Sequence, residues 1–362
     1  MTQILSVRSA FPAHRYPQDV LTRAYADLIG IAPQQARLLA RLQGNAGVDT
    51  RHTVLPLEEY ELLGDAGAVN DRYITEATAL AERALGDALA AGGVDPADVD
   101  LLMLTSVTGV AVPSLDARLI PRLGLRADVK RLPVFGLGCV AGAAGLARLH
   151  DYLRGWPDHV AALVSVELCT LTVPVSGVTT ADMVVSGLFG DGAAALVAGG
   201  AGSAWAGPAH RGESGGPRLP RVVATRSEVF PDSQDALGWQ LGAGGFRIVL
   251  TTELAEVVTR RLGGAVTGFL AGHGLTIDDI GTWICHPGGP KVIDATRDAL
   301  KLPEHAVASS RQSLAAVGNL SSASVLHVLE LTAAAGEAAP GSFGLMIGLG
   351  PGVSAELVLM QW

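Results

Sequence analysis

The amino-acid sequence predicts an α/β fold, a layered αβαβα sandwich built from two similar halves. Apolar stretches of strand length alternate with segments of helical periodicity, which is typical of mixed or parallel sheets covered by helices. Two segments echo each other: GDGAAALV at 190–197 and GPGVSAELVL at 350–359 each place a Gly-containing turn before a strand. A reactive type of residue also follows an apolar strand in each half, Cys139 in the first and His286 in the second.

Composition excludes several classes of protein. The chain has 362 residues, 49% of them hydrophobic and 17% charged, and this length is sufficient for two packed units. A net charge of −9 without a basic tract argues against a nucleic-acid partner. Three scattered cysteines favour a reducing, cytoplasmic location and argue against a disulfide framework or a metal site. We expect no signal peptide and no membrane-spanning helix, because no run approaches about 18 apolar residues.

The first half is expected to cover residues 1–210. Leucines and alanines at helical spacing predict a helix over 18–43, and a second helix over 74–91 ends at the Gly and Pro residues of GGVDPADVD. Residues 172–187 are polar and are expected to be irregular. Strands are predicted at 3–10, 101–106, 132–135, 159–166 and 190–197, and the continuous apolar runs among them are typical of strands covered on both faces.

The stretch from Arg131 to Leu153 organises this half. It predicts a short strand, a Gly-rich turn that carries Cys139, and a helix that begins with the Ala and Gly residues of 141–145. Each Gly costs about 1 kcal/mol of helix propensity relative to Ala, so we expect a buried helix that another backbone approaches closely. The positive end of this helix favours a thiolate. The alternative is that Cys139 is a small buried hydrophobe, as most free cysteines are.

The second half is expected to cover residues 211–362. Between the halves, the Gly- and Pro-containing segment 199–220 predicts a surface loop. Beyond it the apolar pattern predicts helices at 248–262, 291–300 and 321–335, and strands at 221–230, 282–285, 342–347 and 354–360.

Two further polar residues lie in Gly-containing turns. His286 belongs to TWICHPGGPKVID, where it follows a predicted strand and precedes a loop with little conformational freedom. Asn319 belongs to AVGNLSSASVLHVLEL, just before a predicted helix. A histidine is more often structural or solvated than catalytic, and Asn319 has the alternative role of a helix N-cap.

The sequence resembles the type III polyketide synthases of the chalcone and stilbene synthase family. The resemblance rests on the order Cys139, His286 and Asn319 and on their flanks GLGCVAG, HPGGPKVID and GNLSSAS. The resemblance extends over essentially the whole chain and includes three further segments, GLFGDGAAAL (187–196), GFRIVL (245–250) and GLGPG (348–352). The sequence ELCTLT around Cys169 resembles the bacterial branch.

The resemblance implies a thiolase-like fold and an acyltransferase that works without metal or organic cofactor on coenzyme A thioesters. Cys139 would accept the starter from an acyl-CoA and carry the growing chain. His286 would keep Cys139 as a thiolate. His286 and Asn319 would donate hydrogen bonds to malonyl-CoA and stabilise the enolate that forms when carbon dioxide leaves.

The resemblance also implies a substrate pocket and a coenzyme A site. Arg41 matches one of three basic residues that hold the coenzyme A phosphates in plant members, whereas Leu38 and Asn45 occupy the other two positions, and Arg37 lies nearby. The pocket residues implied by the match are Phe189, Phe246, Cys169, Thr172, Val112, Ser321, Gly350 and Pro351.

A homodimer is expected, because Val112 matches the family residue that reaches into the partner's cavity. A smaller residue there favours more room for the starter. The resemblance to bacterial members implies an aliphatic acyl starter and a pyrone or resorcinol product. A β-ketoacyl-ACP synthase III-like condensing enzyme is the alternative, since it shares Cys, His and Asn. A papain-like protease also uses these residues but has a local signature that is absent here.

Overall fold

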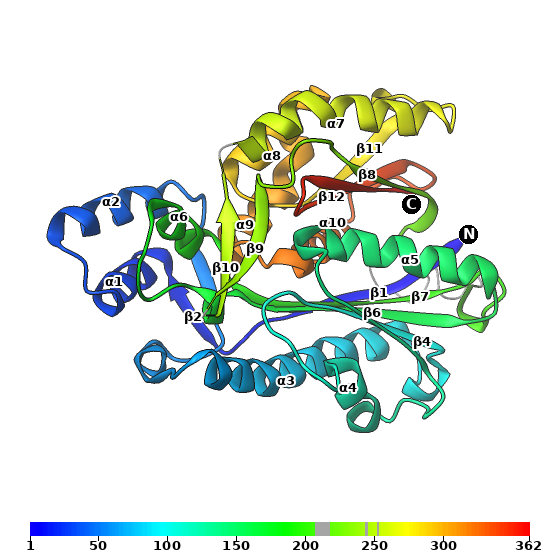
Figure 1. Ribbon diagram of the computed structural model, residues 1–362. Helices are drawn as coiled ribbons and strands as arrows, with labels where there is room; N and C mark the ends of the chain where they lie inside the picture. Colours follow the sequence, from blue (N-terminus) through cyan, green and yellow to red (C-terminus); the bar gives the residue numbers. More distant parts are fainter. Residues whose placement is uncertain (207–217, 243–244, 252) are drawn as a thin grey trace.

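The computed structural model describes residues 1–206, 218–242, 245–251 and 253–362, and it confirms the layered αβαβα architecture (Figure 1). Two helical layers lie outside, two sheet regions lie beneath them, and two helices fill the middle. From the bottom of Figure 1 to the top, the helices of the three layers are α3 (Ala66–Gly92) with α4 (Leu115–Leu123), α5 (Ala141–Gly155) with α10 (Ser324–Ala335), and α7 (Glu253–Ala271) with α8 (Pro290–Leu300).

The strands of the two halves have the same spatial order. It runs β5-β4-β6-β7-β1 in the first half and β11-β12-β13-β8 in the second, so that β4 corresponds to β11 and β1 to β8. In the four corresponding strands of each half one parallel pair is followed by two antiparallel pairs, and the first half has an additional parallel strand, β5, beside β4. The strands are β1 (Thr2–Ala10), β4 (Leu101–Thr105), β5 (Lys130–Val134), β6 (Val160–Leu168), β7 (Asp191–Gly199), β8 (Arg221–Val229), β11 (Ile280–Cys285), β12 (Phe343–Gly350) and β13 (Ser354–Gln361).

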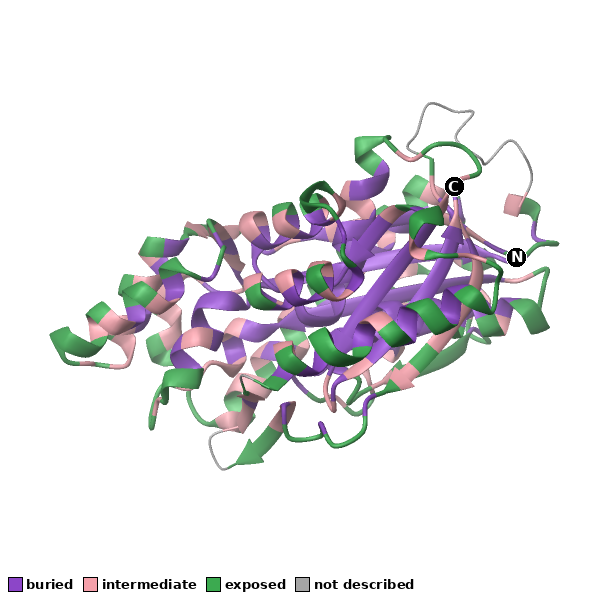
Figure 2. Ribbon diagram, turned by 90° about the horizontal axis from the view of Figure 1, so that it is seen from above, coloured by how far each residue is buried: buried purple, intermediate pink, exposed green. Residues whose placement is uncertain are grey.

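The two sheet regions are joined where β1 meets β8, by the pairs Thr2–Val222 and Gln3–Arg221. Strands in the middle of the fold are buried on both faces (Figure 2). In β4, for example, Leu101 and Met103 pack in the central layer, whereas the alternate residues pack against α3. This two-sided burial explains why these strands are continuous apolar runs in the sequence.

The remaining elements form a lobe beside the sandwich, where the chain differs from two of the sequence predictions. The helix expected at 18–43 is two helices, because Gly30 has a left-handed φ of 61° and Pro33 begins the second helix. The segment expected to be irregular at 172–187 contains a helix that starts with a capping box of Thr179 and Asp182. These three helices are α1 (Gln18–Leu28), α2 (Pro33–Gly44) and α6 (Thr180–Leu188).

The helix expected at 248–262 begins later, at Glu253. Residues up to Leu250 instead form a strand, because their β-branched and aromatic side chains pair with a strand that the sequence did not predict. The expected boundary between the halves, at 210 and 211, lies outside the described residues. Short elements complete the described chain: β2 (His14–Pro17) paired with β3 (Thr50–Thr53), β9 (Leu237–Gly242) paired with β10 (Gly245–Leu250), and α9 (Ala308–Val317).

None of the helices in the described ranges has the length and apolar character needed to cross a membrane. Within the same ranges, no three His, Cys, Asp or Glu side chains are grouped so that they could hold a metal ion.

Candidate active site

Cys139 lies in a tight turn, Gly138–Val140, between β5 and α5. Gly138 has a φ of 56°, and a Cβ there would lie 2.6 Å from the ring of Pro351, so the turn requires glycine both for its conformation and for its packing. Gly350 packs equally closely against this turn, because a Cβ added there would lie 2.7 Å from the main-chain nitrogen of Val140. Gly350 and Pro351, which were predicted pocket residues, therefore support the Cys139 turn from behind.

The small residues at the start of α5 have the packing role that the sequence predicts. A Cβ at Gly142 would lie 2.2 Å from the carbonyl oxygen of Ser322, and a Cβ at Gly145 would lie 2.6 Å from the side chain of Leu163. The first turn of α5 is thus in close backbone contact with the segment that leads into α10. This approach brings Cys139 next to the turn that follows Asn319.

Ser321 links the thiol to this turn. The Cys139 thiol donates to Ser321 Oγ over 3.5 Å, and the Ser321 main-chain nitrogen donates to Asn319 Oδ1 over 2.8 Å. Ser321 has a φ of 51°, which is uncommon for a residue other than glycine. Strain of this kind is often found at functional sites.

The side-chain amide of Asn319 is oriented by its own oxygen. Oδ1 accepts from the Ser321 nitrogen and, over 3.2 Å, from Ser324 Oγ, which fixes the turn after Asn319. Asn319 is not the helix N-cap, because that position is Leu320 for the short helix Ser321–Ala323 and Ala323 for α10. The amide nitrogen makes only a long contact, 3.5 Å, with the carbonyl oxygen of Gly288. Because Oδ1 already accepts two hydrogen bonds, the group that Asn319 can offer to a substrate is a donor.

His286 directly follows β11. Its main-chain nitrogen donates to the carbonyl oxygen of Ile347 over 2.9 Å, and its own carbonyl oxygen accepts from the Gly288 nitrogen. A Cβ at Gly288 would lie 3.2 Å from the imidazole ring, so glycine leaves space beside the ring. The ring is buried, and among the described residues its Nδ1 has no hydrogen-bond partner. Gly288 therefore lies between the imidazole of His286 and the amide of Asn319.

Both reactive groups are neutral in these surroundings. Burial raises the pKa of the Cys139 thiol to about 12, and the hydrogen bond with Ser321 lowers this pKa only in part. Burial lowers the pKa of His286 to about 4. For both side chains desolvation is the largest cause of the shift, and it favours the neutral form. The imidazolium–thiolate pair stays a prediction.

Glu167, at the end of β6, is a site residue that the sequence analysis missed. Its carboxylate is fully buried and accepts hydrogen bonds from Val107 N, Thr108 Oγ1 and Ser322 Oγ, over 3.1, 3.0 and 2.5 Å. Burial raises its pKa to about 7, and its charge in turn raises the pKa of Cys139. The signal in the sequence was a single carboxylate in an otherwise apolar strand.

We expect this carboxylate to make stability depend on pH. An acid whose pKa rises from 4.5 in the unfolded chain to about 7 in the fold binds its proton more tightly when folded. The contribution of Glu167 to the free energy of unfolding is therefore fully present below pH 4.5 and is lost as the pH rises through 7. The free energy of unfolding falls by about 3 kcal/mol over this range. Denaturant unfolding at pH 5 and pH 8 should show a larger loss in the parent than in Glu167→Gln. Equal losses in the two proteins would contradict this prediction.

The predicted pocket residues fall into two groups. Thr172 and Phe246 line a cavity of about 1080 Å³ between α1, the start of α3 and the β9–β10 hairpin, and its wall does not include Cys139, His286 or Asn319. Phe246 also lies 6.1 Å from Phe135, ring centre to ring centre.

The other pocket residues lie outside that cavity wall. Cys169 is buried in the core beside Cys139 and Phe189. Phe189 forms a β-bridge with Asn319. Val112 is 97% exposed.

Arg41 lies on the exposed face of α2, as does Arg37, whereas Leu38 is half-buried. The loop after α2 packs against the start of α8, because a Cβ at Gly47 would lie 3.0 Å from Pro290 Cγ. Arg41 therefore lies on a helix, α2, whose following loop contacts Pro290, four residues after His286 in the sequence.

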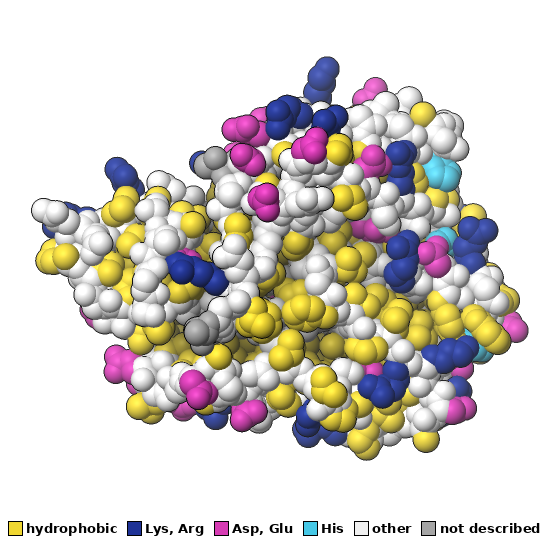
Figure 3. Space-filling model, in the orientation of Figure 1, with side chains coloured by type: hydrophobic (Ala, Val, Ile, Leu, Met, Phe, Trp, Pro, Cys, Tyr) yellow, Lys and Arg dark blue, Asp and Glu magenta, His cyan; other side chains and the backbone are white. Residues whose placement is uncertain are grey.

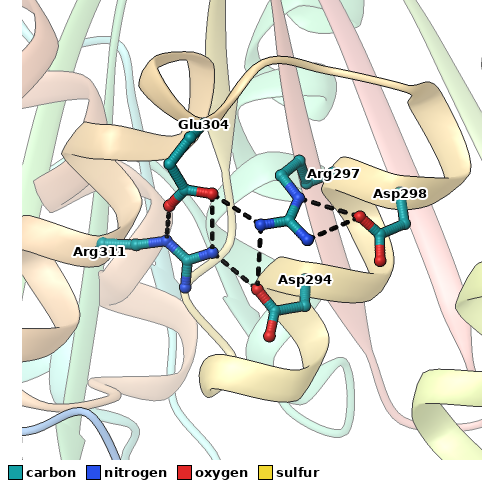
Figure 4. A network of polar contacts seen from close by, with 5 residues as sticks. All are labelled: Asp294, Arg297, Asp298, Glu304 and Arg311. Carbon is teal, nitrogen blue, oxygen red and sulfur yellow. Dashed lines mark hydrogen bonds and ion pairs between the residues drawn. The ribbon is translucent and has the colours of Figure 1, made fainter.

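A network of ion pairs joins the helices next to His286 and Asn319 (Figure 4). Arg297 on α8 contacts Glu304 over 2.6 Å, and Arg311 on α9 contacts Asp294 over 2.7 Å and also pairs with Glu304. Helix α8 begins shortly after His286, and α9 ends two residues before Asn319. The network therefore ties together the two helices whose ends position these side chains.

Comparisons with known proteins agree with this geometry. Residues 221–362 match the family model of the C-terminal domain of chalcone and stilbene synthases, and residues 9–204 match that of FAE1/type III polyketide synthase-like proteins. The chain is 55% identical over 361 residues to 1,3,6,8-tetrahydroxynaphthalene synthase from Streptomyces peucetius subsp. caesius, covering 100% of this chain and 93% of that protein. It is 30% identical over 336 residues to the alpha-pyrone synthesis polyketide synthase-like Pks18 from Mycobacterium tuberculosis (strain CDC 1551 / Oshkosh), covering 91% and 83%.

The crystal structure of 1,3,6,8-tetrahydroxynaphthalene synthase from Streptomyces coelicolor A3(2) superposes with a TM-score of 0.90 at 29% identity, covering 99% of both chains. That structure is of a bacterial type III polyketide synthase, so the match decides between the two condensing enzymes that the sequence left open. The chain belongs to the chalcone and stilbene synthase family and is a type III polyketide synthase of the bacterial branch, an acyltransferase that condenses acyl thioesters.

Proposed function

We propose that this enzyme holds a starter acyl group as a thioester on Cys139, extends it with malonyl-CoA, and closes the product to 1,3,6,8-tetrahydroxynaphthalene or a closely related ring. The observation that carries the proposal is the continuous contact from the Cys139 thiol through Ser321 and Asn319 to the loop of His286. It joins a nucleophile, a hydrogen-bond donor and a base in one buried place.

Loading begins with the neutral pair. The Cys139 thiol gives its proton to His286 while its sulfur bonds to the acyl carbon of the starter thioester. The bond from that carbon to the coenzyme A sulfur then breaks, and the departing thiolate takes the proton from His286. Burial keeps the imidazole of His286 unprotonated at neutral pH, so its ring nitrogen can act as the acceptor, but the low pKa makes it a weak base for this transfer.

Extension uses the amide nitrogen of Asn319 as a donor, because its Oδ1 already accepts from Ser321 and Ser324. The carbon–carbon bond to the malonyl carboxylate breaks, carbon dioxide leaves, and the electron pair forms an enolate. The enolate oxygen accepts hydrogen bonds from the Asn319 amide nitrogen and from His286. The enolate carbon then attacks the acyl carbon on Cys139, whose thiolate leaves. Every electron comes from the carboxylate, so these steps require neither metal nor organic cofactor.

The name of the 55% identical relative supports the choice of product. A tetrahydroxynaphthalene has ten ring carbons with hydroxyl groups on alternate positions, the pattern that results when two-carbon units are joined head to tail. Malonyl-CoA alone can supply all of these units, so no aliphatic starter is required for this product.

An aliphatic starter, with a pyrone or resorcinol product, is the second candidate. The cavity beside Phe246 favours it, because its volume of about 1080 Å³ exceeds the needs of a short starter. Its wall contains several apolar side chains that suit an acyl chain, among them Leu21, Leu28, Leu57, Leu63 and Val69.

A product assay separates the two candidates. The purified enzyme is incubated with malonyl-CoA alone and with a series of aliphatic acyl-CoA starters, and the products are identified by mass spectrometry. A tetrahydroxynaphthalene from malonyl-CoA alone supports the first candidate. Products whose mass follows the added starter, with none from malonyl-CoA alone, would replace it by the second. Turnover that requires a carrier protein would contradict both.

For the substrate, we propose that Arg41 and Arg37 on the exposed face of α2 contact the coenzyme A phosphates, with Cys169, Thr172 and Phe246 nearer the growing chain. We also propose a cytoplasmic location, since all three cysteines are free and buried.

We propose that two copies pair along the edge strand β5. This strand has an unpaired edge in the described sheet, and its residues are mostly exposed. Exposed hydrophobic side chains lie on it and on nearby loops, namely Val110, Val112, Leu132, Phe135 and Leu137. Figure 3 shows hydrophobic side chains gathered across the middle of one face, between α7 above and α3 and α4 below. A pairing that buries such a surface would be isologous and would bring Val112 to the partner's pocket.

Val112→Trp is expected to shift the preference toward shorter starters while the dimer persists, because the larger side chain narrows the partner's pocket. Competition between short and long acyl-CoA starters measures the shift, and sedimentation measures the oligomeric state. Leu62→Trp is the control, since Leu62 is also exposed but lies at the end of the short helix Leu57–Leu62. An unchanged starter preference would remove Val112 from the pocket wall, and a fully active monomer would rule out the dimer.

A further inference from the structure

The main chain of Asn319 is held by the segment that ends α6. The Asn319 nitrogen donates to the Leu188 carbonyl oxygen over 2.8 Å, and the Asn319 carbonyl oxygen accepts from the Gly190 nitrogen over 3.0 Å. These two hydrogen bonds enclose Phe189, which forms the β-bridge with Asn319. Any displacement of Phe189 therefore moves Asn319 as well.

Arg51, on β3, contacts both sides of this bridge. Its Nη1 donates to the Phe189 carbonyl oxygen over 2.6 Å, and its Nε donates to Gln18 Oε1 over 3.0 Å. The aliphatic part of its side chain packs on Gly318, where a Cβ would lie 2.9 Å from Arg51 Cδ. Arg51 thus touches the residue before Asn319 and the residue paired with it.

Burial of the Arg51 guanidinium group is unfavourable for the free energy of folding. Arg51 is 3% exposed, and its guanidinium is stabilised by the charge of the buried Asp191 and by its hydrogen bonds with Phe189 and Gln18. Burial lowers its pKa to about 10, so it is still a cation at neutral pH. An apolar side chain of similar size would avoid the penalty of burying a charged group. The hydrogen bond from the guanidinium to the Phe189 carbonyl oxygen connects this charge to the residue paired with Asn319.

We infer that Arg51 is a positioning residue for Asn319, which it fixes through the Phe189 carbonyl oxygen and through Gly318. The inference rests on the proposed role of Asn319 as a donor to the enolate. A donor that moves by about 1 Å can lose about 100-fold in rate, so a residue that holds the donor in place can control the reaction. Arg51 also lines the cavity beside Phe246, so the test has to separate positioning of Asn319 from contact with the substrate.

The test is a double-mutant cycle in the Cys139→Ala background, where malonyl-CoA is decarboxylated without condensation. Arg51→Met keeps an unbranched apolar side chain to pack on Gly318 and removes the hydrogen-bond donors. We expect it to lower kcat for decarboxylation by about 10- to 100-fold while KM changes little. Arg51→Lys, which retains one donor for Phe189, should restore part of the loss. When Asn319 is already alanine, Arg51→Met should have no further effect.

The controls separate positioning from general stability. Arg15→Met removes an exposed arginine of the adjacent strand β2, which bonds Thr50 instead, and it should leave decarboxylation unchanged. If Arg51→Met does not fold, Arg51→Lys enters the same cycle. A loss of equal size in the presence and absence of the Asn319 side chain would overturn the inference. If Asn319→Ala itself has no effect, the proposed function fails, and the inference fails with it for that distinct reason.

Discussion

Replacing Cys139 with alanine is expected to abolish condensation and leave the fold intact. The side chain is 8% exposed and shrinks by a single sulfur atom, so the cavity left behind is small. Without the thiol, no acyl-enzyme can form, and product formation should fall below detection. Mass spectrometry of the intact protein after incubation with an acyl-CoA measures the covalent intermediate directly, and circular dichroism checks the fold.

Cys169→Ser is the matched control, because Cys169 is also buried in the same cluster but has no proposed nucleophilic role. It should still be acylated and should at most alter the products. Acylation of Cys139→Ala, or loss of acylation in Cys169→Ser, would show that the wrong cysteine has been assigned.

Asn319→Ala is expected to lower malonyl-CoA decarboxylation by about 100- to 1000-fold, the usual cost of removing one donor from an oxyanion site. Alanine also removes Oδ1, which accepts from the Ser321 nitrogen, so this variant loses stability as well as activity. The rate of carbon dioxide release in the Cys139→Ala background measures the effect free of condensation.

Asn319→Asp distinguishes the two roles of the side chain. Aspartate keeps an acceptor for Ser321 and Ser324, but in its ionised form it cannot donate to the enolate oxygen. Because Asn319 is buried, the carboxylate lowers the free energy of unfolding, and the decarboxylation rate is measured well above neutral pH, where it is ionised. We expect a rate as low as that of Asn319→Ala. Full decarboxylation by Asn319→Asp would mean that Asn319 serves only to fix the turn that follows it.

The sequence was most informative where chemistry and backbone geometry coincide in a short stretch. The turn around Cys139 needs glycine for its φ and small residues for close helix packing, and both requirements are visible as GLGCVAGAAG. The alternation of strands and helices was predictable for the same reason, because two-sided burial requires continuous apolar runs.

What could not be predicted depends on contacts between distant segments. Arg51 and Gln18 differ by 33 positions, and each becomes significant only because α6 ends beside them. The protonation state of Cys139 was also beyond reach, since the helix N-terminus is local whereas desolvation depends on the whole fold around the thiol. The break at Gly30 was missed because apolar periodicity continues across it.

The two halves, which share a strand order, each contribute different residues to the candidate site. Helices α5 and α10 occupy corresponding places, and each begins at the same interface in the middle of the molecule. The thiol of Cys139 comes from the first half of the chain, and the imidazole of His286 and the amide of Asn319 come from the second. Neither half holds all three side chains, so selection for the reaction acts on the contact between the halves. The outer surface of each half can therefore diverge without changing this contact.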